Sequence, residues 1–296
     1  MSNPCKRFRS LLNSPGIIRS LGAHDVFSAR VVELAGLETV FLGGFGVSAS
    51  LLGLPDVGLT TLSEMVDAVA RMAKRVNIPV VADGDTGHGD LHNVARTVRE
   101  FEAAGAAGIL LEDQTNPKRC GHFQGKQIVP TREWILRLKA AQDARKNPDF
   151  VIIARTDSLA IDGVNAAIDR ANQAAEAGAD VCFIEAPQTR EQLERIPREV
   201  PHPLLVNMLT GGVTPILPAQ ELEKLGYKIV VCPIESLMVA GAAIQQLVNT
   251  FLQTGRVDIP QAGPMFSFKE LKETLGLADI AGLKDRLDPV VESAAK

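Results

Sequence analysis

The chain has 296 residues, of which 46% are hydrophobic, and a formal net charge of −4 at neutral pH. This length allows one large or two smaller α/β domains with a sizeable core. No basic face and no long apolar stretch stands out, so we expect neither a nucleic-acid partner nor a membrane span. Residues 1–10 are polar and basic without a following apolar signal segment, so we expect a cytoplasmic protein.

Short apolar runs recur along the chain and predict eight strands. Seven of the runs end in a charged or polar residue, or in glycine or proline. A run that is apolar on both faces is typical of a parallel strand buried on both sides. The runs lie at 39–42, 79–82, 108–111, 151–154, 181–184, 204–206 and 229–232, and a further strand is expected before them at 17–21.

Helical segments with a 3.6-residue period separate these runs, most clearly at 62–76, 91–104, 131–145, 164–177 and 237–253. Several expected helices end in a glycine that suits a left-handed C-cap, namely Gly36, Gly105, Gly178 and Gly226. Alternating strands and helices predict a parallel sheet with right-handed crossovers.

Polar residues end the strands nearly all the way round, which favours a closed α/β sheet, a (β/α)8 TIM barrel, over an open doubly wound sheet. An open sheet would place its ligand site at a single switch point. We predict one domain over residues 1–296, with 256–296 as a C-terminal helical tail.

Carboxylates follow two neighbouring strands of the predicted barrel. Asp83 and Asp85 come directly after one strand, Glu112 ends the next, and Asp56 lies in a nearby turn. Hard oxygen ligands without paired His or Cys favour Mg²⁺, or Mn²⁺ in its place, over zinc. The alternative is that the aspartates only cap a helix or form turns.

A long loop between Glu112 and the helix near residue 131 carries Lys118, Arg119, Cys120 and His122. A loop of this kind at the rim of a barrel is typical of a lid, and its thiol, imidazole and cations suit an anionic substrate and proton transfer. Positive neighbours are expected to lower the pKa of the Cys120 thiol. The alternative is a solvated basic loop with an incidental cysteine.

Further polar groups are predicted to reach the same rim. Arg155 leaves a buried strand and therefore needs an anionic partner, either a substrate carboxylate or, alternatively, Glu185 or Asp157 in an internal salt bridge. Glu185 and Asn207 follow other strands, and residues 43–48 offer backbone N–H groups for a carboxylate or an oxyanion.

Five motifs together resemble the isocitrate lyase/phosphoenolpyruvate mutase superfamily, and within it the 2-methylisocitrate lyases, 2,3-dimethylmalate lyase and petal death protein. They are Leu-Gly-Leu-Pro-Asp at 52–56, Asp-Gly-Asp-Thr-Gly at 83–87, Leu-Glu-Asp-Gln at 111–114, Lys-Arg-Cys-Gly-His at 118–122 and Ala-Arg-Thr-Asp at 154–157. The resemblance runs from about residue 8 to 255.

The resemblance implies a Mg²⁺-dependent barrel in a homotetramer whose eighth helix is exchanged between neighbouring subunits. It implies that Asp83 and Asp85 hold Mg²⁺, with Asp56 and Glu112 acting partly through water. The catalytic residues would be Cys120, as the acid that protonates the carbanion, with His122, Lys118 and Arg155. The carboxylate substrate would bind to a set of seven residues: Gly43, Gly44, Phe45, Arg155, Glu185, Asn207 and Pro233.

The resemblance also implies a carbon–carbon lyase that cleaves a 2-hydroxy di- or tricarboxylate, of the 2,3-dimethylmalate or 2-methylisocitrate type, by retro-aldol chemistry. Residues 207–212 read Asn-Met-Leu-Thr-Gly-Gly where methylisocitrate lyases typically carry Asn-Ile/Met-Thr-Glu-Phe-Gly, and the missing glutamate favours a dicarboxylate. Pro233 argues against oxaloacetate hydrolysis, since hydrolases of the superfamily carry serine there. Carboxyphosphonoenolpyruvate mutase chemistry, the hydrolase, and a barrel that only binds a small anion stay open as alternatives.

Overall fold

The computed structural model describes residues 3–283 and 286–287, and its chain divides into two compact units, residues 1–238 and 239–296. The boundary between the units falls inside helix α10 (Glu235–Thr254), before the predicted start of the tail at residue 256. The limits predicted for the domain and its tail stay a prediction.

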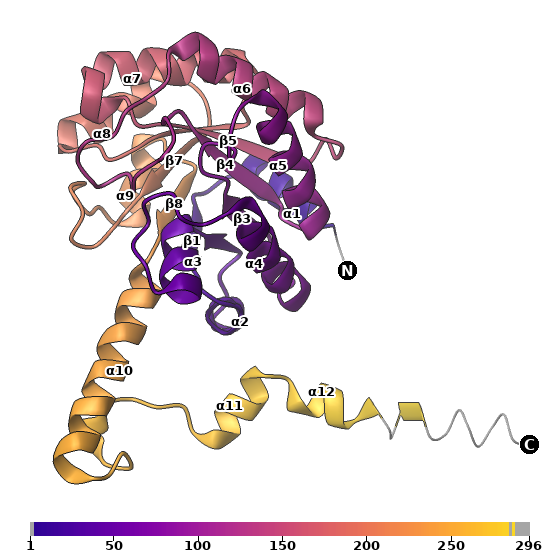
Figure 1. Ribbon diagram of the computed structural model, residues 1–296, viewed down its shortest axis with the longest axis vertical. Helices are drawn as coiled ribbons and strands as arrows, with labels where there is room; N and C mark the ends of the chain where they lie inside the picture. The colour runs from indigo at the N-terminus through magenta and orange to yellow at the C-terminus, as the bar shows by residue number, and fades with distance from the viewer. Residues whose placement is uncertain (1–2, 284–285, 288–296) are drawn as a thin grey trace, which may run out of the picture. The chain divides into compact units, whose positions relative to one another are not determined.

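The first unit is a closed barrel of eight parallel strands in which each strand pairs with the next and β8 pairs with β1 (Figure 1). The strands are β1 (Ile18–Gly22), β2 (Thr39–Leu42), β3 (Val80–Asp83), β4 (Gly108–Glu112), β5 (Val151–Thr156), β6 (Val181–Ile184), β7 (Leu204–Asn207) and β8 (Ile229–Cys232). Every strand overlaps the apolar run predicted for it, so the predicted (β/α)8 barrel is confirmed.

Helices cover the outside of this barrel. They are α1 (Pro4–Asn13), α2 (Val26–Leu34), α3 (Gly44–Val47) with the π-helical turn η1 (Ser48–Leu52), α4 (Leu62–Arg75), α5 (Leu91–Ala104), α6 (Thr131–Ala144), α7 (Leu159–Glu176), α8 (Arg190–Glu199) and α9 (Ala219–Leu225). The five clearest predicted helices are present. Helix α7 begins at Leu159, earlier than predicted, because a non-helical turn at Gly163 (φ 84°) joins two helical pieces.

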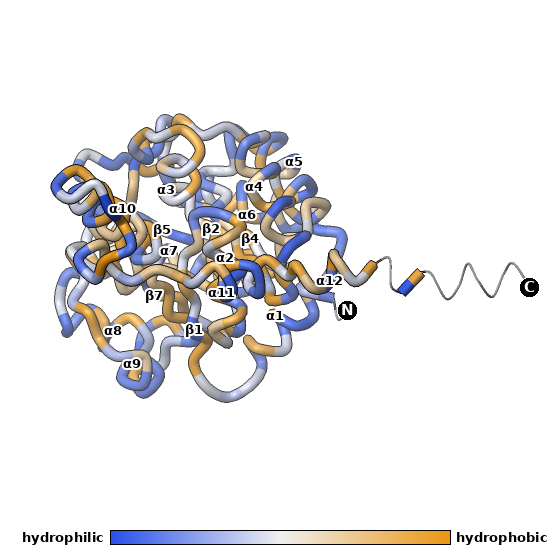
Figure 2. The backbone as a smooth tube through the Cα atoms, turned by 90° about the horizontal axis from the view of Figure 1, so that it is seen from below, coloured by the Kyte–Doolittle hydropathy of each residue, from blue (hydrophilic) through white to orange (hydrophobic). Residues whose placement is uncertain are grey.

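The interior of the barrel is filled by apolar side chains from alternate strand positions, and Phe8 and Leu12 of α1 pack against this cluster. The opposite faces of the strands pack against the surrounding helices. In Figure 2 orange, hydrophobic segments occur on the strands, and the surrounding helices show both orange and blue segments. Since both strand faces are occupied, polar side chains are placed where the strands end.

The second unit contains the rest of α10, the 3₁₀ turn η2 (Pro260–Ala262), α11 (Phe268–Thr274) and α12 (Leu277–Ala281). The Thr250 hydroxyl of α10 donates a hydrogen bond to the Gln261 carbonyl at 2.9 Å. Large apolar side chains such as Leu252, Phe268 and Ile280 are more than 70% exposed in the single chain. The predicted exchange of this helix between subunits stays a prediction. No helix within the described ranges is long and apolar enough to cross a membrane.

Candidate functional site

The carboxyl ends of the strands bring most of the predicted site residues to one rim of the barrel, around a cavity of about 60 Å³. The predicted residues that line this cavity are Gly43, Gly44, Phe45, Asp56, Asp83, Cys120, His122, Arg155, Glu185, Asn207 and Pro233. The other predicted residues, Lys118, Asp85 and Glu112, contact members of this lining. The strand order therefore assembles residues that are up to 190 positions apart (Gly43 and Pro233).

Lys118 of the loop lies among the predicted metal ligands. Its Nζ is 2.6 Å from Asp56 Oδ1 and 2.7 Å from Asp85 Oδ1, and all three side chains are buried. Although burial opposes the charge, the surrounding carboxylates hold the pKa of Lys118 well above its usual value. Asp85 has a left-handed backbone (φ 48°), a conformation that Asp tolerates better than most residues.

Asp83 and Glu112 are the buried carboxyl groups at the ends of β3 and β4. Asp83 accepts hydrogen bonds from the N–H groups of Asp85 (3.0 Å) and Gly44 (3.3 Å). Burial raises the pKa of Asp83 to about 6, and the charge of Asp85 adds to this effect. Burial also raises the pKa of Glu112 well above its usual value. Glu112 Oε1 is buried and has no hydrogen-bond partner within the described residues.

The donor set at this rim fits a hard divalent cation. A Cβ added to Gly44 would lie 3.2 Å from Asp85 Oδ1, 3.3 Å from Lys118 Nζ and 3.5 Å from Asp83 Oδ2, so two carboxylates and the ammonium group face the small space that the glycine leaves open. Four buried carboxylates without His or Cys are the ligands that Mg²⁺ prefers. As the side chains stand, Lys118 bridges Asp56 and Asp85, and in the described part of the chain no three acidic, His or Cys side chains are gathered around one point.

Arg155 is held by three carboxylates. Its Nε and Nη2 donate to Asp157 at 2.9 and 3.1 Å, its Nη1 is 3.3 Å from Glu112, and its Nε is 3.3 Å from Glu185. The internal salt bridge, which the sequence gave as the alternative partner of Arg155, is therefore present. The guanidinium also borders the cavity, so it can bind an anion there as well.

The loop lies over the cavity. The Cys120 N–H donates to the Asp56 carbonyl at 3.3 Å, and His122 Nε2 is 3.4 Å from Glu185 Oε1. Burial raises the pKa of Cys120 to about 11, so the expectation of a lowered thiol pKa was wrong. Lys118 pairs with Asp56 and Asp85, and the Arg119 guanidinium donates to the Gln124 carbonyl at 3.2 Å. Desolvation of the thiol therefore dominates its pKa.

The backbone at the start of α3 and the ends of β7 and β8 complete the lining. The Gly44 N–H, predicted to be available to a substrate, already donates to Asp83. Asn207 Oδ1 is buried, and no donor reaches it from the described residues. Pro233 follows β8 and borders the cavity, as the resemblance implied. The binding and catalytic roles of all these residues stay predictions.

The sequence did not reveal a second layer of charged groups behind the rim. The Asp113 carboxylate accepts from the Thr156 hydroxyl (2.6 Å), the Asp157 N–H (2.9 Å) and Arg170 Nη1 (2.9 Å). Lys126 pairs with Asp157 at 2.9 Å. Asp113 and Asp157 lie within recognised motifs, but only the fold shows which partners they hold.

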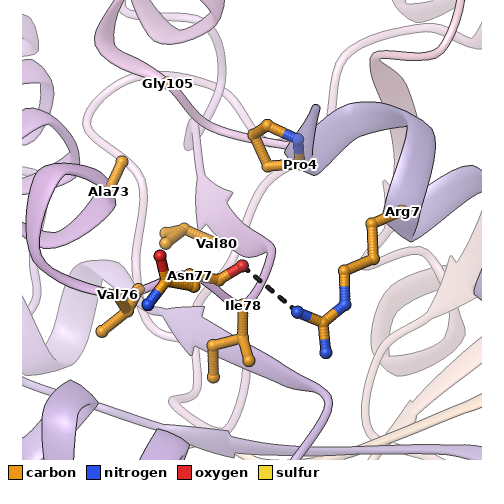
Figure 3. Close-up of a pocket in the computed structure, with 8 residues that line it drawn as sticks. All are labelled: Pro4, Arg7, Ala73, Val76, Asn77, Ile78, Val80 and Gly105. Atoms are coloured by element: carbon orange, nitrogen blue, oxygen red, sulfur yellow. Dashed lines mark hydrogen bonds between the residues drawn. The ribbon is translucent and has the colours of Figure 1, made fainter. Parts of the chain in front are cut away.

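A larger cavity, of about 210 Å³, lies at the opposite end of the barrel (Figure 3). It is bordered by Pro4 and Arg7 of α1, the end of α4 and the start of β3. The Arg7 guanidinium, which is the charged group drawn in Figure 3, donates to the Asn77 carbonyl at 3.3 Å. With mostly apolar neighbours and no pair of titratable groups, this cavity is a poor candidate for catalysis.

A parallel barrel with buried carboxylates, an arginine and a covering loop at its carboxyl rim belongs to the class of barrel enzymes. The family model described as phosphoenolpyruvate phosphomutase matches residues 8–252. The chain belongs to this family, the isocitrate lyase/phosphoenolpyruvate mutase superfamily, as its motifs predicted.

Two curated relatives are named as lyases. This agrees with the predicted enzyme class, a carbon–carbon lyase. A 2,3-dimethylmalate lyase from Eubacterium barkeri is 43% identical over 94% of this chain and 96% of that protein. A 2-methylisocitrate lyase from Halalkalibacterium halodurans is 39% identical over 96% of this chain and 94% of that protein.

Solved structures of the superfamily have the same fold. Oxaloacetate acetylhydrolase in complex with 3,3-difluorooxalacetate matches with a TM-score of 0.91 at 34% identity, over 97% of both chains. Phosphonopyruvate hydrolase in complex with oxalate and Mg²⁺ matches with a TM-score of 0.86 at 29% identity, over 96% of this chain and 99% of that chain.

Proposed function

We propose that the protein is a Mg²⁺-dependent carbon–carbon lyase that cleaves a 2-hydroxy dicarboxylate of the 2,3-dimethylmalate type to pyruvate and a second carboxylic acid. One observation carries the proposal: a thiol, a buried arginine and four buried carboxylates meet under one loop at the carboxyl rim. The likeness to the Eubacterium barkeri lyase supports this choice of substrate.

The reaction breaks the bond between the hydroxyl-bearing carbon and the carbon next to the second carboxylate. The hydroxyl gives its proton to a carboxylate at the rim, the first fragment becomes the keto acid, and the bonding electron pair stays on the second fragment as a carbanion. Arg155 binds a substrate carboxylate at the rim of the cavity. Cys120, whose raised pKa keeps its thiol protonated at neutral pH, donates the proton that the carbanion takes up.

The divalent ion of the proposal would be held by Asp83 and Asp85, with Asp56 and Glu112 acting partly through water. When bound, it would supply Lewis-acid stabilisation of the oxygen on which charge develops. The small space beside Gly44 and the unpartnered Oε1 of Glu112 support these ligands. The ammonium group of Lys118 would then contact the same carboxylates as the ion, those of Asp56 and Asp85. The loop holding Cys120 keeps water away from the carbanion.

The lining of the cavity favours a dicarboxylate over a tricarboxylate such as 2-methylisocitrate. Apolar groups from Phe45, Leu209 and Ile234 border the cavity, while the arginine that lines it is Arg155. A third carboxylate would need another cation. A methyl-substituted dicarboxylate therefore suits these groups better, with 2-methylisocitrate as the nearest alternative.

Oxaloacetate hydrolysis is the second candidate, because the oxaloacetate acetylhydrolase structure is so similar to this chain. Pro233 weighs against it, since it offers no hydroxyl at the cavity. Phosphonate-forming mutase chemistry, and binding of a small anion without turnover, are further outcomes that an experiment must separate.

The test is a panel of 2-hydroxy diacids and triacids, with oxaloacetate and a carboxyphosphonate substrate, assayed with and without Mg²⁺. Release of pyruvate from 2,3-dimethylmalate supports the proposal. Keto-acid release from triacids alone (pyruvate from 2-methylisocitrate), oxalate from oxaloacetate, or a phosphonate detected by phosphorus NMR would each contradict it. Binding of these anions in calorimetry without any product would identify a binding protein instead.

A further inference from the structure

Lys126, at the far end of the loop, ties the loop to the barrel at a second place, apart from the Lys118 pairs with Asp56 and Asp85. Its side chain is only 3% exposed, and its Nζ donates both to the Gly121 carbonyl within the loop and to Asp157 Oδ1 at 2.9 Å. An ammonium group buried this deeply is stable only with such partners. One side chain therefore joins the part of the loop between Cys120 and His122 to a residue that follows β5.

Asp157, the partner of Lys126, is also the main partner of Arg155. It accepts two hydrogen bonds from the Arg155 guanidinium, at 2.9 and 3.1 Å, and is completely buried. Its own N–H is fixed by Asp113 at 2.9 Å, and Asp113 is in turn bound by Arg170 at 2.9 Å. Asp157 is therefore a rigid point to which both the loop and the arginine are attached.

Gly121 shows how closely the loop lies on the site. A Cβ added there would stand 2.5 Å from Arg155 Nη2 and 2.5 Å from Glu185 Cγ. The loop peptide thus packs directly on the Arg155–Glu185 pair with no space between them. Where the Gly121 carbonyl is held decides whether Cys120 and His122 stand over the cavity.

We propose that Lys126 is a positioning residue that holds the loop closed, by joining the Gly121 carbonyl to the same aspartate that orients Arg155. The Asp157 carboxylate then has two effects. It keeps the loop that carries Cys120 closed over the site, and it aligns the guanidinium of Arg155. Only the expected change in turnover rests on the proposed function, because the position of the loop can be measured without any substrate.

Lys126→Met should release the loop without unfolding the barrel. Asp157 keeps Arg155 as a partner in this variant, so no carboxylate is left buried and alone. The closed state loses a buried ion pair and a hydrogen bond, so we expect the open population of the loop to rise about tenfold or more. The Lys126→Gln variant, which keeps a donor but not the charge, gives an independent test should Lys126→Met fold poorly.

The measurement uses substrate-free and metal-free protein. Alkylation of Cys120 by iodoacetamide is followed by peptide mass spectrometry, with buried Cys182 as the internal reference, and cleavage after exposed Arg119 is followed with an arginine-specific protease. We expect both rates to rise about tenfold in Lys126→Met, with Cys182 still protected and the melting curve cooperative. Lys228→Met is the matched control, because Lys228 also donates to backbone carbonyls, those of Ser14 and Gly16, but at the opposite end of the barrel.

Unchanged alkylation of Cys120 and unchanged cleavage at Arg119 in a folded Lys126 variant would overturn the proposal. A general rise that includes Cys182 would do the same, because it would show a purely structural role. In turnover assays, kcat/KM should fall about tenfold in Lys126→Met and stay normal in Lys228→Met. If the wild-type protein turns over no 2-hydroxy acid, the proposed function fails while the labelling result still decides the role of Lys126.

Discussion

Both ends of the barrel carry a charged cluster, partly exposed at the amino end and buried at the carboxyl end, and only the first has all its hydrogen bonds made. At the amino end, the Asp180 carboxylate accepts from Arg9 (2.8 Å), Arg145 (2.7 Å) and the Ile152 N–H (2.8 Å). At the carboxyl end, Glu112 Oε1 and Asn207 Oδ1 are buried without a donor from any described residue. Since buried polar atoms are almost always paired, these two unmet acceptors at the strand ends are suited to take hydrogen bonds from a ligand.

The cavity that Pro4, Arg7 and the start of β3 border at the amino end has a volume of about 210 Å³, against about 60 Å³ for the cavity that the predicted site residues line at the carboxyl end. The smaller one is bordered by a thiol, an imidazole, a guanidinium and carboxylates, and a loop covers it. The chemistry of the lining, and not the volume, therefore identifies the site.

The largest effect is expected from removing a carboxylate at the carboxyl end, because the comparison assigns the metal and the chemistry to that end. Asp85→Ala should lower Mg²⁺-dependent turnover by about 10⁴-fold or more, because a Lewis acid supplies several kcal/mol of the catalysis. Steady-state assays across a Mg²⁺ titration and calorimetric Mg²⁺ binding measure the effect. An unchanged Mg²⁺ requirement would show that the ion is held elsewhere.

The next test concerns the covering loop. Cys120→Ser should lower kcat by about 10²–10³-fold, since the thiol is the proposed proton donor. Calorimetry should give nearly the same Mg²⁺ affinity as for the wild type, because the thiol is not among the proposed ligands. Near-normal turnover of this variant would remove Cys120 from the mechanism.

At the amino end we expect an effect on stability alone. Asp180→Asn weakens the partly exposed pairs with Arg9 and Arg145 and should lower the free energy of unfolding by about 2 kcal/mol. Urea denaturation measures this change, and kcat and KM should not move. A kinetic defect without a loss of stability would contradict the separation of the two ends.

The pH dependence of Cys120 should be small in the neutral range. Burial raises its pKa from 9.0 to about 11, so the protonated thiol persists at neutral pH and is lost only as the pH rises through about 11. Turnover limited by this acid should therefore show no alkaline decline before about pH 10. The part of folding stability that comes from the raised pKa is likewise present below pH 9 and lost as the pH rises through about 11. Rapid alkylation of Cys120 at pH 7 in the wild type would contradict the raised pKa.

The sequence predicted the barrel because seven of its eight strands contain an apolar run and helices separate these runs. It also predicted which residues meet at the rim, since Asp83, Glu112 and Asn207 end their strands and Glu185 directly follows one. It was wrong about the pKa of Cys120. Charge that is near in sequence says nothing about how deeply a thiol is buried or where the neighbouring cations point.

The pattern of the chain determined the fold, the family and the rim that carries the chemistry, because strand periodicity and motif order are local properties. Only the tertiary structure decided that Lys118 bridges Asp56 and Asp85, that Asp157 holds Arg155 and Lys126 together, and that Asp113 fixes Asp157. Apart from Arg155 and Asp157, which are two residues apart at the end of β5, these pairings join different strands or loops. Which residues pair depends on which strands become neighbours when the barrel closes, and a local sequence pattern does not contain that information.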